Sequence, residues 1–138
     1  MSLFRMKKSR GFTLLELLTT MFIIAALASL IFPNIRKAMD KGRLSGCQSN
    51  LRALATQLQL YANDNETKYP STLTILIPKY IRAIPECPAA AIDTYTAGYA
   101  TSIEQTVFTI CCKGKNHELT NLGEDEPYYD MVSGLGPK

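Results

Sequence analysis

A long apolar run near the N-terminus constrains this chain more than any other feature. It extends over 21 residues from Phe12 to Phe32, and its one charged residue is Glu16. A helix rises about 1.5 Å per residue, so the run would span about 30 Å, the thickness of a bilayer core. A charge in the middle of such a helix costs roughly 2.5–3.5 kcal/mol, and less near its end, where Glu16 lies. A carboxylate at this position still needs a partner, and we take it as a functional residue. The run therefore predicts a membrane-spanning helix with a functional carboxylate.

A short basic segment precedes this run. Residues 1–11 contain four basic side chains and no acidic one: Arg5, Lys7, Lys8 and Arg10. The formal charge of the whole chain is +3, and it becomes −1 when this segment is removed. Such a nearly neutral remainder gives no reason to expect nucleic-acid binding.

The junction between the basic segment and the apolar run carries a specific motif. Gly11-Phe-Thr-Leu-Leu-Glu16, with Pro33 closing the run, resembles the class III signal of type IV pilins and type II secretion pseudopilins. The resemblance implies that prepilin peptidase cuts after Gly11 and that the new amine of Phe12 is N-methylated. It also implies that Glu16 pairs with the Phe12 amine of a neighbouring subunit. Because an unpaired buried charge costs roughly 3–5 kcal/mol, this pair would set the register of assembly.

The same resemblance implies a structural filament subunit rather than an enzyme. Its partners would be further copies of itself, prepilin peptidase/methylase, an assembly ATPase with its inner-membrane platform, and minor pilins or pseudopilins. It would begin as a single-pass protein of the bacterial inner membrane with a periplasmic head, and then enter a periplasmic or cell-surface filament. A secretion pseudopilus is the main interpretation, and a pilus for adhesion, motility or DNA uptake is the alternative.

A second cleavage site has to be weighed against the first. Ala26-Leu27-Ala28 fits the small-x-small pattern of ordinary signal peptidase, and a cut there would release a soluble binding domain that begins at Ser29. The presence of Glu16 within the apolar run argues against this cut. The helical pattern, which continues past Ala28, argues against it as well.

Helical periodicity continues beyond Pro33. Apolar residues with three- and four-residue spacing, best kept in the second half, form one stripe: Ile35, Met39, Cys47, Leu51, Leu54, Leu58 and Tyr61. We therefore expect one helix from about Phe12 to Ala62. It should bend or locally melt at Pro33, which removes a backbone hydrogen bond, and at Gly42, which has low helix propensity.

The rest of the chain predicts a small head. Ser71 would cap a short helix that ends near Ile77, residues 93–102 and 106–113 would form a hairpin, and one short strand would lie near 128–132. A long N-terminal helix followed by a small antiparallel sheet indicates a pilin-like α+β fold. The expected parts are a leader (1–11), a transmembrane and polymerisation helix (12–34), an amphipathic helix (35–63) and a globular head (64–138).

The chain has four cysteines, at 47, 87, 111 and 112, and a translocated head would lie in an oxidising compartment. Sequence alone does not choose among their three full pairings. The head resembles those of pseudopilins in four short motifs: Cys47-x-x-Asn50-Leu51, Tyr69-Pro70, Pro85-x-Cys87-Pro88-Ala89-Ala90 and Cys112-x-Gly114-x-x-His117. The preferred disulfide is Cys87–Cys112. Cys47 would be a buried thiol or pair with Cys111, and a fully reduced state is the alternative.

His117 and the acidic C-terminal residues give weaker indications. Cys112 precedes His117 by five residues, and a thiol enzyme with Cys112 as nucleophile and His117 as base is a further alternative. No third group orients them, so we expect a solvated His117 and no catalytic residue. Four acidic residues are candidates for calcium ligands: Glu124, Asp125, Glu126 and Asp130. Their spacing matches no strict calcium loop, so we expect a solvated loop without a cofactor.

Overall fold

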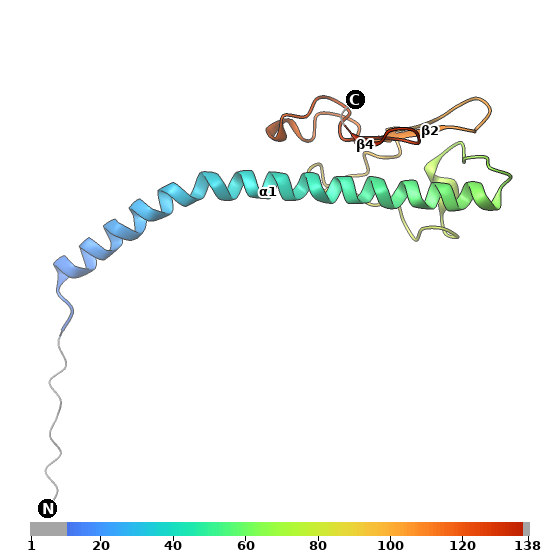
Figure 1. Ribbon diagram of the computed structural model, residues 1–138. Helices are drawn as coiled ribbons and strands as arrows, with labels where there is room; N and C mark the ends of the chain where they lie inside the picture. Colours follow the sequence, from blue (N-terminus) through green and yellow to red (C-terminus); the bar gives the residue numbers. More distant parts are fainter. Residues whose placement is uncertain (1–10, 137–138) are drawn as a thin grey trace, which may run out of the picture. The chain divides into compact units, whose positions relative to one another are not determined.

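The computed structural model describes residues 11–136, and Figure 1 shows the order of their elements. The basic leader up to Arg10 lies outside the described residues. The chain divides into two units, one ending at Arg36 and the other beginning at Lys37. One long helix contributes to both units, and the predicted pilin-like α+β layout is confirmed by the small antiparallel sheet of the second unit.

The helix α1 runs from Leu14 to Asp64. It begins directly after Thr13, whose Oγ1 accepts a hydrogen bond of 3.2 Å from the backbone N–H of Glu16. This is the usual way in which a threonine satisfies an unpaired donor in the first helical turn. Pro33 and Gly42 both lie inside α1, and the helix continues through them without interruption. Local melting at these residues was therefore wrong, and a bend at either residue stays a prediction.

The core of the second unit is built on one face of α1. Its buried positions recur at three- and four-residue intervals, as one helical face requires: Cys47, Leu51, Leu54, Ala55, Leu58 and Ala62. The predicted stripe is thus confirmed from Cys47 onward. Ile35 and Met39, assigned to the same stripe, are exposed because the buried face begins only at Cys47.

A short 3₁₀ helix, η1 (Leu73–Leu76), adds two leucines to this core. We expected Ser71 to cap a short helix that ends near Ile77; the end agrees with the structure, whereas the cap was wrong. Thr72 is the residue before η1, and its hydroxyl bonds the hydroxyl of Thr74 rather than a helix N–H. Ile77 is extended because Pro78 follows it and disfavours the helical conformation of the preceding residue.

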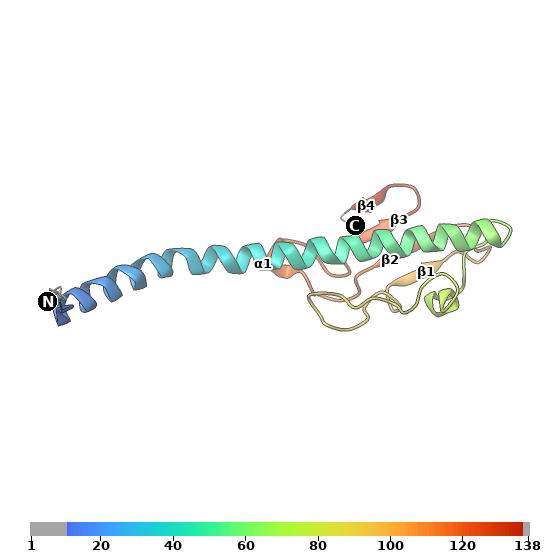
Figure 2. The same ribbon diagram turned by 90° about the horizontal axis from the view of Figure 1, so that it is seen from below.

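Four short strands form an antiparallel meander in the order β1-β2-β3-β4. Their bounds are Tyr99–Thr101, Phe108–Cys111, Tyr128–Asp130 and Gly134–Gly136, and a second 3₁₀ helix, η2 (Glu118–Thr120), lies between β2 and β3. In Figures 1 and 2 the strands lie beside the later part of α1. The expected hairpin is confirmed as β1 and β2, whereas β4 was not expected.

The sheet contributes aromatic side chains to the core. Phe108 and Ile110, which alternate with partly exposed residues along β2, are fully buried. The ring of Phe108 lies 4.7 Å from that of Tyr69 and 6.1 Å from that of Tyr129, centroid to centroid. Tyr69 and Tyr129 therefore pack against the core of the head.

Candidate functional site

The predicted processing site lies outside α1. Gly11 and Phe12 precede the capping residue Thr13 and are exposed. A peptidase needs an accessible peptide bond that is not locked in a helix. The Gly11–Phe12 bond meets this requirement, because the helix begins two residues later, at Leu14.

Glu16 lies in the first turn of α1, where the helix dipole favours a negative charge. Its carboxylate makes no hydrogen bond or ion pair with another described residue. Three hydroxyl groups in the same run are satisfied within the helix, since Thr19, Thr20 and Ser29 each donate to a carbonyl at 2.7–3.0 Å. Of these polar side chains, Glu16 is thus the one that needs a partner from outside the described chain.

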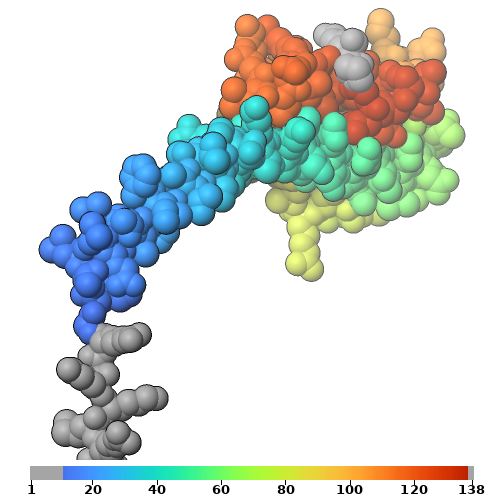
Figure 3. Space-filling model, turned by 60° about the vertical axis from the view of Figure 1, so that its left-hand side comes forward, coloured from blue at the N-terminus to red at the C-terminus, as the bar shows by residue number. Residues whose placement is uncertain are grey.

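The apolar surface of the first unit is uncovered. Phe12, Met21 and Phe22 are each about two-thirds exposed or more, and the most apolar window of α1 has none of its residues buried. Figure 3 shows this segment in blue. By length and composition α1 is able to cross a membrane. So large an exposed apolar surface marks a membrane or protein interaction site.

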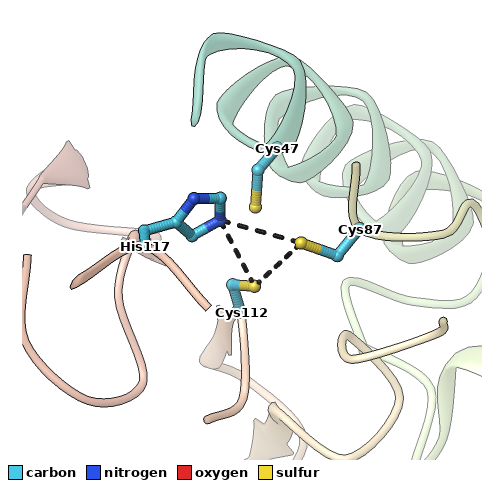
Figure 4. A group of neighbouring side chains, drawn as sticks. All are labelled: Cys47, Cys87, Cys112 and His117. Atoms are coloured by element: carbon cyan, nitrogen blue, oxygen red, sulfur yellow. Dashed lines mark hydrogen bonds between the residues drawn. The ribbon is translucent and has the colours of Figure 1, made fainter. Parts of the chain in front are cut away.

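A second candidate site lies in the second unit, where four buried side chains converge (Figure 4). Cys47 comes from α1, Cys87 from the connection after η1, Cys112 from the residue after β2, and His117 from the residue before η2. Their sulfur and ring-nitrogen atoms all lie within 4.8 Å of one another. The Sγ atoms of Cys87 and Cys112 are 3.4 Å apart, and His117 Nε2 is 3.7 Å from each.

A tight turn presents Cys87 to this cluster. The N–H of Ala91 donates to the Cys87 carbonyl at 2.7 Å, and the N–H of Cys87 donates to the Ile92 carbonyl at 2.9 Å. Pro85 and Pro88 restrict the backbone on either side. Cys87 is therefore held in place by local hydrogen bonds although it lies in an irregular segment.

A second turn brings His117 back to Cys112. Asn116 closes it by donating to the Lys113 carbonyl at 2.8 Å, and its amide also donates to Cys112 Sγ at 3.4 Å. Gly114 has a φ of +99°, a conformation that glycine adopts without strain. The turn thus positions two side chains, five residues apart, on one side of the backbone.

Polar groups surround the sulfur atoms. Tyr95 donates to Cys47 Sγ at 3.3 Å, and the Thr94 hydroxyl lies 3.2 Å from Cys112 Sγ. The hydrogen bond from Cys47, supported by those of Thr94 and Asn116, lowers the pKa of Cys112 to about 5. The same bond, together with burial, raises the pKa of Cys47. The site therefore stabilises a thiolate at Cys112.

The structure brings together the two cysteines that we expected to form a disulfide. No disulfide joins Cys87 and Cys112 in the structure, since their sulfur atoms are 3.4 Å apart and the S–S bond length is about 2.05 Å. This disulfide stays a prediction. Cys47 lies in the same cluster, whereas Cys111 Sγ faces the Gly98 carbonyl at 3.5 Å.

The expectation that His117 is solvated was wrong. It is 3% exposed, because the turn over 113–116 folds it back onto the head. The spacing Cys112-x-Gly114-x-x-His117 was noted only as part of a resemblance; that a glycine turn here separates two metal-binding side-chain types was missed. The burial of Cys112, which has no exposed surface, also removes it from substrates, whereas reactive cysteines are partly accessible.

The calcium candidates are not brought together in this way. Among the described residues, the Cys47 cluster is the group of three or more potential ligands with metal-binding spacing. Asp125 accepts from Lys113 and Gly114 at 2.8 Å, Glu126 from the Gly123 N–H at 2.6 Å, and Asp130 from the Val132 N–H at 2.6 Å. Glu124 is exposed. The expectation of a solvated loop without bound calcium stays a prediction.

Comparison with known proteins gives two kinds of match. The prokaryotic N-terminal methylation motif matches residues 6–32. The type II secretion system core protein G of Klebsiella pneumoniae is 40% identical over 96% of this chain and 87% of its own length, and that of Escherichia coli (strain K12) is 33% identical over 94% and 83%. Competence protein ComGC of Bacillus subtilis (strain 168) is 29% identical over 64% and 91%. No solved structure matches the chain significantly.

Proposed function

Because this chain belongs to the family of the type II secretion system core protein G, we propose that it is a structural subunit of a pseudopilus filament. The observation that carries the proposal is the match to the Klebsiella pneumoniae protein, which extends through helix and head alike. The methylation motif and the uncovered apolar helix agree with it. The chain's role is thus structural, and it acts through its contacts with other subunits of the filament.

Processing is the first step of the proposed assembly. Prepilin peptidase cuts after Gly11, and the enzyme that methylates prepilins modifies the amine of Phe12. The exposure of both residues ahead of α1 supports this order. The cut removes the basic leader and leaves a cationic amine at the start of an apolar segment, four residues from Glu16.

Glu16 then directs docking. In a filament core, the Phe12 amine of one subunit neutralises the Glu16 carboxylate of its neighbour, and the apolar helices pack around the pair. The proposal is supported by the absence of any partner for Glu16 within the described chain. A subunit docked at the wrong depth leaves both charges unpaired, at a cost of roughly 3–5 kcal/mol.

The remaining partners and the location follow from the same role. Before assembly the subunit is held in the bacterial inner membrane by the first part of α1, with its head in the periplasm. An ATPase and an inner-membrane platform drive it into a periplasmic or surface filament, together with minor pseudopilins. The chain without its leader has a formal net charge of −1, so we do not expect a nucleic acid among these partners.

The mass and the N-terminal residue of the mature protein test the processing step. We expect an N-methylated Phe12 terminus in membrane and sheared-surface fractions. A terminus at Ser29 would contradict the proposal and identify a soluble domain released after Ala28. An uncut Met1 in cells that contain prepilin peptidase would contradict it as well.

Glu16→Ala tests the docking step. We expect filaments to fall at least about a hundredfold, because the unpaired amine remains buried, while membrane levels of the processed subunit stay normal. Glu118→Ala is the matched control, since Glu118 is an exposed acid of the head. Normal filament yield from Glu16→Ala would exclude the pairing.

A filament for competence is the second candidate. The match to ComGC, at 29% identity over 91% of that shorter protein, supports this second candidate. Deleting the gene and measuring both protein secretion and DNA uptake separates the two. Loss of secretion with normal uptake identifies a pseudopilin, and the reverse identifies a competence pilin.

A further inference from the structure

We propose that Cys47, Cys87, Cys112 and His117 form a structural zinc site that fastens α1, the proline-flanked turn and the sheet to one another. The four side chains come from segments 40, 25 and 5 residues apart in sequence, and all four are buried. The site lies wholly within one subunit, so its test does not depend on filament assembly.

The geometry of the cluster fits a zinc ion. In a tetrahedral site with Zn–S bonds of about 2.3 Å and Zn–N bonds of about 2.0–2.1 Å, neighbouring sulfurs are about 3.8 Å apart and a sulfur lies about 3.6 Å from the nitrogen. The observed distances are 3.4 Å between Cys87 and Cys112 and 3.7 Å from His117 to each. The upper limit of 4.8 Å for all pairs requires little movement of Cys47.

The ligand types also select zinc. Three thiolates and one imidazole form a common structural zinc set, and soft sulfur ligands disfavour calcium and magnesium. Four protein ligands close the coordination shell, so no position remains for a water or a substrate. The burial of the cluster agrees with a structural rather than a catalytic ion.

The surrounding hydrogen bonds support bound thiolates. A neutral thiol is a weak acceptor, whereas a thiolate is a good one. Tyr95 and Asn116 donate to Cys47 and Cys112, and Thr94 is placed to donate to Cys112. Such outer groups commonly orient metal ligands and tune their affinity.

A disulfide accounts for less of this arrangement. Bonding Cys87 to Cys112 would use two of the four converging side chains and leave Cys47 and His117 buried beside it without a role. Zinc uses all four. It also supplies stability that a small head with strands of three or four residues needs, as metals do in other small domains.

Metal analysis of the full-length protein in detergent is the direct test. We expect one zinc per chain, and thiols that react with a disulfide reagent much faster after a strong chelator removes the metal. Cobalt(II) added to the stripped protein should give the intense visible bands of tetrahedral thiolate coordination. Metal-free protein that takes up neither ion, or whose mass shows two hydrogens lost to a Cys87–Cys112 bond, would overturn the proposal.

Variants locate the ion. Cys112→Ser should abolish stoichiometric zinc, whereas Cys111→Ser, which changes the adjacent thiol outside the cluster, should retain it. His117→Cys should keep zinc and shift the cobalt spectrum, and it remains informative if Cys112→Ser does not fold. Tyr95→Phe should weaken zinc binding about tenfold through its lost hydrogen bond. Unchanged cobalt bands in His117→Cys would exclude His117 as a ligand and overturn the site as drawn.

Discussion

At the scale of single residues, Gly98 shows how closely the segments of the head approach one another. A Cβ at this position would lie 2.2 Å from the carbonyl oxygen of Cys111 and 2.9 Å from its sulfur. The backbones of the two residues also exchange a hydrogen bond, from the Cys111 N–H to the Gly98 carbonyl, at 3.1 Å. The close approach of residue 98, just before β1, to β2 is therefore possible only because glycine has no side chain.

Gly98→Ala is expected to lower the free energy of unfolding by about 1–3 kcal/mol, because the backbone of β2 has to move away. Urea unfolding followed by tyrosine circular dichroism measures this, since the chain has no tryptophan. Gly136→Ala, where an added Cβ meets no atom within 4 Å, is the control and should be nearly neutral. Equal effects would show that the backbone near Cys111 moves away from the added Cβ at little cost in free energy.

Tyr99 gives a prediction at alkaline pH. Burial raises its pKa to about 12, and its hydroxyl donates to the Pro70 carbonyl at 2.6 Å. The folded pKa lies above that of the unfolded chain, about 10, so the neutral phenol stabilises the fold fully below pH 10. This contribution is lost as the pH rises from 10 to 12.

Tyr99→Phe should cost about 1 kcal/mol at neutral pH, because it removes one hydrogen bond. Between pH 10 and 12 the variant should lose less stability than the unmodified protein, so the difference between them shrinks. Unfolding curves of both proteins at several pH values measure this. A difference that stays constant with pH would assign the alkaline loss to other groups.

At the scale of elements, α1 carries two surfaces of different kinds. Up to Arg36 its apolar side chains are exposed, and from Cys47 onward one face is buried against the head. Sequence reasoning predicted both parts, because helical periodicity and apolar length are local properties of the chain. It missed β4, since Gly134-Leu-Gly136 contains no strong strand former and becomes a strand by pairing with β3.

Leu54→Ala is expected to destabilise the head by about 2–5 kcal/mol, since Leu54 is fully buried and its loss leaves a cavity. Leu60, about half exposed on the same helix, is the matched control, and its replacement by alanine should change stability by about 0.5 kcal/mol. Thermal and urea unfolding compare the two. Similar losses would mean that helix propensity rather than packing sets the stability of this segment.

At the scale of the whole molecule, the hydrophobic core lies entirely in the second unit. A fragment of residues 37–138 should therefore fold as a soluble monomer, whereas the full chain should require detergent or a filament. Size-exclusion chromatography and tyrosine circular dichroism measure this. An aggregated or unfolded fragment would show that the first unit stabilises the head.

The cysteine–histidine cluster also belongs to this scale, and this explains why it was predicted only in part. The proximity of Cys87 and Cys112 was expected. The contributions of Cys47 and His117 depend on how a helix, a turn and a sheet meet, and no local pattern reports that meeting. In the sequence, His117 looks like a solvated residue after a turn. Its burial is explained only by the three cysteine side chains that surround it in the fold.

The position of Cys47 has a mechanical consequence. Along α1 it is the first fully buried described residue, so it marks the edge at which helix and head begin to adhere. A tensile load that enters through α1 concentrates at such an edge, because peeling breaks contacts one after another, whereas shearing must break them together. A zinc ion bound at this edge would hold α1 and the head together at the point where separation would otherwise begin. The contacts between helix and head would then have to break together by shear, which requires a larger force than peeling.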